Sequence, residues 1–79
     1  MSEQTPIEEY LKLADSRSLD ILFWLLNNRD SENRLNTTLD TVAVENAVTK
    51  VTVNRVFQKL YKEGFLVKER NGQYQMLKV

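Results

Sequence analysis

The sequence contains neither cysteine nor histidine, and its 79 residues include only two glycines and one proline. Without cysteine there is no disulfide scaffold, no thiolate metal site and no cysteine nucleophile. The lack of histidine removes the commonest general base and the commonest zinc ligand. The carboxylates form no plausible acid–base pair either. We therefore expect neither an enzyme nor a protein that carries a metal or another cofactor.

Long hydrophobic runs are also missing. The longest uninterrupted apolar stretch covers residues 21–26, far fewer than the roughly 20 residues that a membrane-spanning helix needs. The first four residues, Met-Ser-Glu-Gln, lack the basic and apolar segments of a signal peptide. No segment rich in Pro, Gly or Ser interrupts the chain. We expect a single domain in the cytoplasm, with no membrane partner.

The charges are balanced overall but not along the chain. Eleven basic and eleven acidic residues give a net charge of zero, which by itself argues against a nucleic-acid partner. Residues 1–48, however, carry four basic and nine acidic side chains, whereas residues 49–79 carry seven basic and two acidic ones. Such asymmetry between the halves indicates a polyanion partner for the basic half.

Capping residues and apolar spacing predict four helices and a short strand. Each predicted helix begins near a threonine or serine, the residues that favour helix N-termini. We expect helices over residues 5 to about 14, 16–28, 39–45 and 49–63, and a short strand over residues 34–37.

The helix over residues 49–63 is the most readable element. Thr49 is its expected N-cap, and Gly64 stands where a left-handed residue commonly ends a helix. Its apolar residues follow the spacing i, i+3, i+4, i+7 of one buried face. We expect these four to face the core: Val53, Val56, Phe57 and Leu60.

A β-hairpin is predicted to follow. Residues 65–70 and 73–77 flank Asn71-Gly72, the strongest signal for a two-residue type I′ turn. Such a turn fixes the register, so one face is expected to pair Arg70 with Gln73, Lys68 with Gln75 and Leu66 with Leu77. The other face then pairs Glu69 with Tyr74 and Val67 with Met76. We expect Val67, Tyr74 and Met76 to join the core and Lys68, Arg70, Gln73 and Gln75 to form a basic ribbon.

The order helix, strand, helix, turn, helix, hairpin resembles a bacterial winged helix-turn-helix domain. Residues 19–78 are most similar to the winged-helix part of RepL-type plasmid replication proteins. The similarity lies in the motifs Leu25-Leu26-Asn27-Asn28, Asn36-Thr37-Thr38, Thr52-Val53 and Asn71-Gly72-Gln73-Tyr74. The resemblance implies an α+β fold over 1–79, with an N-terminal helical extension (1–15), a helical core (16–63) and a wing (64–79).

The turn before the last helix departs from the family pattern. Ala47 stands where a glycine is usual, and Asn46 stands where an apolar residue is usual. Alanine fits only if the turn avoids left-handed φ there or accepts some strain. Asparagine tolerates left-handed φ better than most residues, so the bend can also shift to Asn46.

The outward side of the helix over residues 49–63 is suited to duplex DNA, because a helix fits the major groove and presents its first turns to base edges. Asn54 can bond adenine, Arg55 guanine, and Val51 can touch a thymine methyl group. Thr49 and Thr52 suit a phosphate oxygen. Gln58 and Lys62 are as well explained by solvation. The candidate DNA-binding residues are Thr49, Lys50, Val51, Thr52, Asn54, Arg55, Lys59, Lys68, Arg70 and Gln73.

The apolar run over residues 21–26 exceeds what one buried helix face requires. Phe23 and Trp24 lie off the side of that helix marked by its leucines. Either the N-terminal segment, through Ile7, Tyr10, Leu11 and Ala14, folds over them, or they form a two-fold dimer interface. We favour a homodimer through Tyr10, Leu11, Phe23 and Trp24, because so short a chain has few other means to cover this surface. A dimer would place two recognition helices about 34 Å apart and predict a palindromic site.

These observations predict a sequence-specific protein that binds double-stranded DNA and acts in transcription regulation or in plasmid or phage replication control. Residues 49–59 would enter the major groove while residues 68–73 contact the backbone or minor groove. Such a protein is expected on the bacterial nucleoid. The alternative is a winged helix used as a protein-interaction module that does not bind DNA, which the zero net charge favours.

Overall fold

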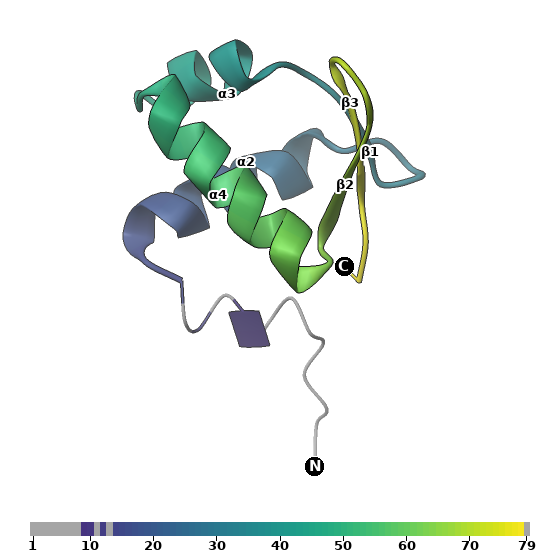
Figure 1. The fold of residues 1–79 in the computed structure, drawn as a ribbon, viewed down its shortest axis with the longest axis horizontal. Helices are drawn as coiled ribbons and strands as arrows, with labels where there is room; N and C mark the ends of the chain where they lie inside the picture. Colours follow the sequence, from purple (N-terminus) through teal and green to yellow (C-terminus); the bar gives the residue numbers. More distant parts are fainter. Residues whose placement is uncertain (1–8, 11, 13, 79) are drawn as a thin grey trace.

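A computed structural model describes residues 9, 10, 12 and 14–78 of the chain. The elements that it defines form an α+β winged helix, with three helices and a three-stranded antiparallel sheet (Figure 1). In chain order they are α2 (Ser16–Asn28), β1 (Arg34–Asn36), α3 (Leu39–Glu45), α4 (Lys50–Glu63), β2 (Leu66–Arg70) and β3 (Gln73–Met76). The helix expected over residues 5 to 14 lies largely outside the described residues and stays a prediction.

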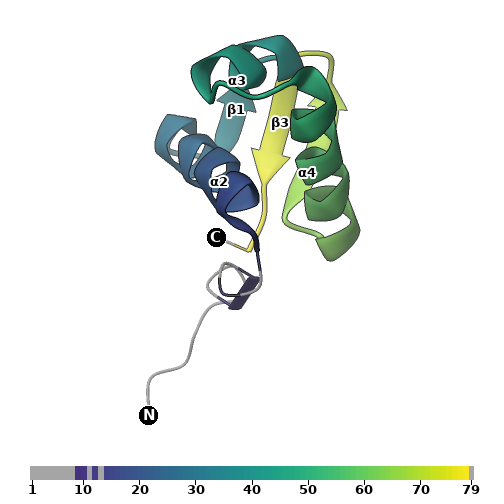
Figure 2. The same cartoon turned by 90° about the vertical axis from the view of Figure 1, so that its left-hand side faces the viewer.

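The sheet stands at one side of the molecule, and the helices cover only one of its faces (Figure 1). Its strand order is β1-β3-β2, so the last strand in sequence is the central one. Figure 2 shows α2 and α4 side by side in front of the strands, with α3 across one end. None of these helices is both long enough and apolar enough to pass through a bilayer.

Side-chain caps begin each of the three helices. The hydroxyl oxygens of Thr38 and Thr49 accept hydrogen bonds from the backbone N–H groups three residues on, each at 3.2 Å. Asp15, which sequence analysis did not single out, does the same for Ser18 at 2.8 Å. Gly64 ends α4 with φ +79°. These caps satisfy backbone donors that have no partner inside the helix, which explains why α3 and α4 begin where the sequence predicts.

The core lies between α4, α2 and the inner face of the sheet. The four residues predicted to face inward from α4 are each at most 3 % exposed. They meet apolar side chains from every other element, and the buried cluster as a whole contains Ile21, Leu22, Leu25, Leu35, Val42, Ala43, Val53, Val56, Phe57, Leu60, Phe65, Leu66, Tyr74 and Met76. Trp24 and Leu26 are partly buried against it. The helical spacing therefore predicted the buried side of α4 correctly.

The register predicted for the hairpin is wrong over most of its length. Only the pair of Arg70 with Gln73 is as expected. A bulge between Lys68 and Arg70 shifts the remaining pairs, so that Lys68 lies opposite Tyr74, Val67 opposite Gln75 and Leu66 opposite Met76. One extra residue, Glu69, is accommodated in β2 at this point, as is characteristic of a β-bulge.

The shifted register changes which side chains reach the core. Leu66, which was expected on the outer face, is 1 % exposed, whereas Val67, which was expected in the core, is 44 % exposed. Tyr74 and Met76 are buried as predicted. The bulge thus lets the larger leucine face the helices, and burial of the larger apolar side chain stabilises the fold more.

The turn of the hairpin is also not the type I′ turn that Asn71-Gly72 predicts. Gly72 has φ +79°, but Asn71 is not among the described residues with positive φ. A type I′ turn needs positive φ at both central residues. A single left-handed residue beside a bulge replaces it, which is the physical reason for the register error.

The turn between α3 and α4 keeps its bend at the residue where glycine is usual. Ala47 has φ +53°, while Asn46 has φ −103°. The bend therefore does not shift to Asn46, and that alternative from the sequence is wrong. Asn46 instead ends α3, its side-chain amide donating to the carbonyl oxygen of Val42 at 2.8 Å. The chain accepts a left-handed alanine, a conformation that costs an L-residue about 1–2 kcal/mol.

We predict that Ala47→Gly raises the free energy of unfolding by about 0.5–1 kcal/mol. Glycine removes the left-handed strain, and its greater freedom in the unfolded chain offsets part of the gain. Ala47 is exposed, so no buried contact is lost. Urea denaturation measures the change. Ala43→Gly is the control, because Ala43 is helical and buried, and there the substitution should destabilise by about 1 kcal/mol. Equal destabilisation by the two substitutions would refute the strain at Ala47.

Candidate nucleic-acid interface

The outward side of α4 carries the longest run of candidate residues. Val51, Asn54 and Arg55 are exposed on the first two turns, and Gln58 and Lys62 continue the same side toward the end of the helix. Val51 is 67 % exposed, although a valine contributes to folding mainly when it is buried. The helix therefore presents amide, guanidinium and methyl groups together, which are the groups that can distinguish base edges.

The start of α4 is held against α3. The N-cap hydroxyl of Thr49 lies 3.0 Å from the hydroxyl of Thr52. Lys50 forms an ion pair with Asp40 at 3.6 Å, in which both side chains are more than half exposed. Exposed pairs of this kind contribute at most about 1 kcal/mol. This weak ion pair places the Lys50 side chain at the start of α4 but leaves its ammonium group able to bind another anion.

Lys59 lies on a different flank of α4. It is nine residues after Lys50, and at 100° per residue this places the two lysines on opposite sides of the helix. Lys59 lines a cavity together with Tyr10, Asp15 and Glu63. Hydrogen bonds from Ser18 lower the pKa of the Asp15 carboxyl, and the positive charge of Lys59 lowers it further. Lys59 thus balances acidic groups near the start of α2 and is separated from Asn54.

The hairpin places its two basic candidates on opposite faces. Lys68 lies opposite Tyr74, whose side chain is buried toward the helices, so Lys68 lies on the helix-facing side beyond the end of the core. Arg70 lies opposite Gln73, on the outer side. The expected ribbon of Lys68, Arg70, Gln73 and Gln75 on one face is therefore wrong, because the bulge separates Lys68 from the other three.

The tip of the hairpin and the start of α4 lie at the same end of the molecule (Figure 1). The tip is held there by the segment before α3, since the N–H of Thr37 donates to the carbonyl oxygen of Gly72 at 3.0 Å. The first turn of α4 and the residues around Gly72 can therefore face one extended partner together.

An aromatic cluster joins α4 to the hairpin. The ring of Phe57 lies 5.2 Å from that of Tyr74 at an interplanar angle of 81°, and 6.3 Å from that of Tyr61. Burial raises the pKa of Tyr61 to about 12, and the nearby charge and hydrogen bond of Tyr74 add to this rise. Burial also raises the pKa of Tyr74, against the effect of the same hydrogen bond. This cluster fixes the hairpin relative to the outward side of α4.

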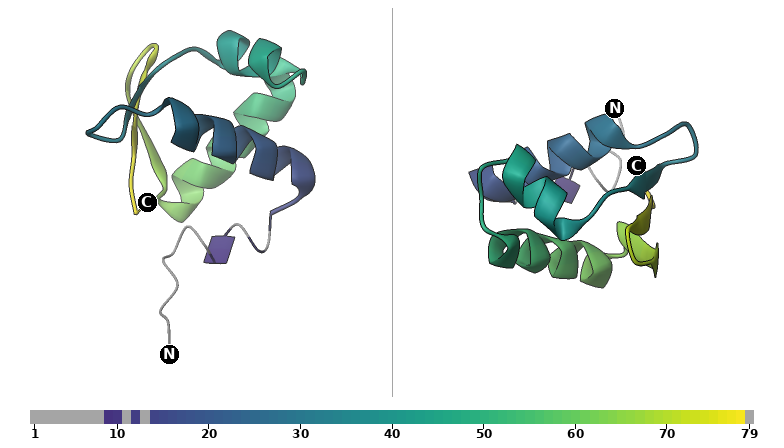
Figure 3. Two further views of the ribbon diagram at one scale, coloured as in Figure 1. Left: turned by 180° about the vertical axis from the view of Figure 1, so that it is seen from behind. Right: turned by 90° about the horizontal axis from the view of Figure 1, so that it is seen from above.

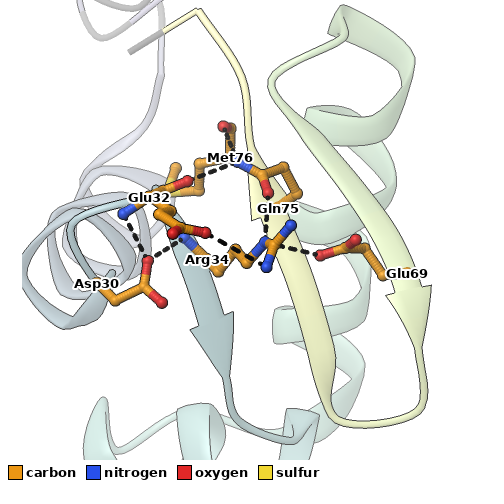
Figure 4. Close-up of polar contacts among 6 residues, drawn as sticks. All are labelled: Asp30, Glu32, Arg34, Glu69, Gln75 and Met76. Carbon is orange, nitrogen blue, oxygen red and sulfur yellow. Dashed lines mark hydrogen bonds and ion pairs between the residues drawn. The ribbon is translucent and has the colours of Figure 1, made fainter.

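Arg34 was not among the sequence candidates, yet it is central to the outer face of the sheet (Figure 4). Its Nε donates to Oε1 of Gln75 at 3.1 Å and lies 3.6 Å from a carboxylate oxygen of Glu69. A second carboxylate, on Glu32, lies 3.4 Å from its Nη1. The side-chain amide of Gln75 donates in turn to the carbonyl oxygen of Glu32 at 2.8 Å. Through Arg34, β1 is tied to both strands of the hairpin.

The same face is hollowed beside Arg34. Arg70, Asn36 and Gln73 line this hollow with Arg34, and so do the carboxylates of Asp30 and Glu69. The guanidinium and amide groups can bind phosphate oxygens, whereas the two carboxylates repel an anion, so the hollow is of mixed charge. No local signal predicts this cluster, because Arg34 is 41 residues from Gln75 in sequence.

The four candidate interface residues for a dimer are not all together. Tyr10 packs against Phe65, with ring centroids 5.3 Å apart, near the start of α2. Phe23 and Trp24 line a depression near the turn between α3 and α4. Leu11 lies outside the described residues. The dimer stays a prediction.

Three further findings bear on the function of the chain. Within residues 9, 10, 12 and 14–78, no group of three or more acidic side chains is arranged to hold a metal ion. The sequence model of the family described as Firmicute plasmid replication protein (RepL) matches residues 6–78. Neither the curated proteins nor the solved structures contain a significant match.

We predict that the protein loses stability between pH 10 and about 12, where folded Tyr61 keeps its proton. Below pH 10 Tyr61 is neutral in both states. Above it the unfolded chain ionises first, so rising pH favours unfolding. Urea denaturation from pH 9 to 11.5 measures the slope. Tyr61→Phe should flatten it, because the variant removes the tyrosine with the largest shift, whereas an unchanged slope would contradict the buried environment of Tyr61.

Proposed function

Because the chain belongs to the RepL family of Firmicute plasmid replication proteins, we propose that it acts in replication control by binding duplex DNA directly. The start of α4, residues 49–59, enters the major groove. The hairpin, residues 65–78, lies along the sugar–phosphate backbone with its tip, residues 68–73, at the adjacent minor groove. Family membership favours replication control over transcription regulation as the process served.

The observation that carries this proposal is the division of α4 into two sides. Its four core residues are at most 3 % exposed, while Val51, Asn54 and Arg55 on the opposite side are all exposed. A helix held this firmly by its buried side presents its other side in one orientation. In the major groove Asn54 pairs with an adenine edge, Arg55 with a guanine edge, and Val51 with a thymine methyl group.

The charges around this side of α4 support the proposal. Residues 49–79 contain seven cations and two carboxylates. Of these carboxylates, Glu69 is paired with Arg34 on the outer face of the sheet, and Glu63 lies at the far end of α4. Neither opposes Arg55. Asp40 does contact Lys50, but a phosphate oxygen can replace an exposed carboxylate at little cost.

Phosphate contacts come from different elements and set the register of the protein on DNA. Lys50 and the backbone amides at the start of α4 reach one strand. Lys68 lies on the helix-facing side of the hairpin and Arg70 near its tip. Arg34, which lines the same hollow as Arg70, adds a further contact only if a phosphate oxygen replaces its exposed carboxylate partners Glu32 and Glu69. These contacts position the protein, while Asn54, Arg55 and Val51 supply sequence discrimination.

We predict that binding to a random duplex is strongly salt-dependent. For four to six phosphate contacts, the slope of log affinity against log salt is about −4 to −5. Fluorescence anisotropy with a labelled duplex over a salt series gives this slope. No binding at low salt would exclude the proposal and leave the alternative, a winged helix that serves only as a protein-interaction module.

We predict that Arg55→Ala weakens binding to a selected site by about 1–3 kcal/mol, since Arg55 reads a base. Binding sites are first selected from a random DNA pool. Arg17→Ala is the matched control, because it removes the same charge from an exposed position on α2 and should change affinity by less than about twofold. If Arg55→Ala weakens binding to selected and random duplexes equally, Arg55 contacts phosphate and not a base.

A further inference from the structure

A second surface, on the acidic half of the chain, has no role in this proposal. A depression lies between α2 and the turn that connects α3 to α4. The residues that line it are Asp20, Phe23, Trp24, Asn27, Glu45, Asn46 and Ala47, which we call the α2 patch. Phe23 is 48 % exposed, and Trp24 is only partly buried against the core. Two aromatic side chains thus line one depression, and Phe23 in particular is more exposed than its contribution to the core requires.

The α2 patch carries charge of one sign. Asp20 and Glu45 are both exposed, and none of the residues that line the patch is a lysine or arginine. Nucleic acid is therefore excluded as its occupant, because phosphates would meet carboxylates. The patch combines two aromatic residues, a type enriched at protein interfaces, with two charged ones.

Because the α2 patch carries only negative charge, it favours a different protein over a second copy of this chain as its partner. In a two-fold dimer a surface faces itself. Asp20 and Glu45 would then be buried near the same carboxylates of the other copy, and like charges brought together oppose binding. A partner that brings cations pairs with both carboxylates.

We propose that the α2 patch binds a basic and apolar segment of another protein. Lysine or arginine side chains of that segment pair with Asp20 and Glu45. An aliphatic or aromatic side chain packs on Phe23 and Trp24, and a cation over the Trp24 ring adds an attraction of its own. Seen from above, α2 and α4 lie on opposite sides of α3 (Figure 3). A partner seated against α2 is therefore separated by α3 from most of α4, while Asn46 and Ala47 bring the edge of the patch close to the start of α4.

Trp24 provides a direct signal, because it is the only tryptophan in the chain. Random 12-residue peptides displayed on phage are selected against the whole protein. Peptides that are enriched and lack tryptophan are synthesised and titrated while Trp24 emission is recorded. We expect the enriched peptides to combine lysine or arginine with apolar residues, and to shift Trp24 emission to shorter wavelength.

Matched variants test the contacts. Phe23→Ser should weaken peptide binding by about tenfold or more, while Val67→Ser, which changes a valine 44 % exposed on the hairpin, should not. The double variant Asp20→Asn with Glu45→Gln should weaken binding and reduce its salt dependence. Glu32→Gln with Glu63→Gln removes the same charge elsewhere and should leave binding unchanged. Far-ultraviolet circular dichroism checks that each variant is folded.

Several outcomes would overturn the proposal. Enriched peptides that are acidic or uncharged, or no enrichment at all, would contradict the predicted chemistry. Binding that is insensitive to Phe23→Ser would place the site elsewhere. Sedimentation equilibrium tests whether a second copy of the chain occupies the patch. A dimer that Phe23→Ser converts to a monomer would assign the α2 patch to a second copy. None of these results depends on whether α4 binds DNA, which the salt series tests separately.

Discussion

The packing of α4 on the sheet is the contact on which the other features depend. Phe57 is fully buried, with its ring edge-to-face on Tyr74 at 5.2 Å, and such aromatic pairs add about 0.5–1.5 kcal/mol to the effect of burial. Rotation of α4 about its axis would break this pair and expose Val53, Val56 and Leu60. The contact therefore fixes the outward side of the helix. It also fixes the hairpin beside that side, so the proposed interface is a consequence of the core.

Charge is separated along the chain, and the fold keeps the separation in space. The acidic half forms α2, β1 and α3, and the basic half forms α4 and the hairpin. Charged side chains of the two halves do meet: Arg34 brings a cation from the acidic half to the outer face of the hairpin, Asp40 pairs with Lys50, and Asp15 lies beside Lys59 in one cavity. The two proposed surfaces follow this division. Net charge is uninformative here because a zero total conceals two surfaces of opposite sign, each suited to a different partner.

Local signals predicted most of the fold. The N-cap Thr49, the end of α4 at Gly64 and the buried stripe of α4 each depend on residues only a few positions apart, so they can be read from a short window of sequence. For α3 the sequence offered Thr37 or Thr38 as the cap, and the structure selects Thr38. The same argument predicted the outward position of Asn54 and Arg55. It failed at the hairpin, where Asn71-Gly72 does connect the paired Arg70 and Gln73 but without the type I′ conformation, and a bulge between Lys68 and Arg70 shifts the register.

By itself the sequence determined the order of the elements, the winged-helix arrangement and the two sides of α4, because helical periodicity and capping act within a few residues. Only the tertiary structure decided the register of β2, the separation of Lys68 from Arg70, and the meeting of Arg34 with Gln75 across 41 residues. The positive φ of Ala47 was likewise decided only by the tertiary structure. Each depends on how distant segments pack together, and that packing outweighs the local preference of a turn or of a single residue.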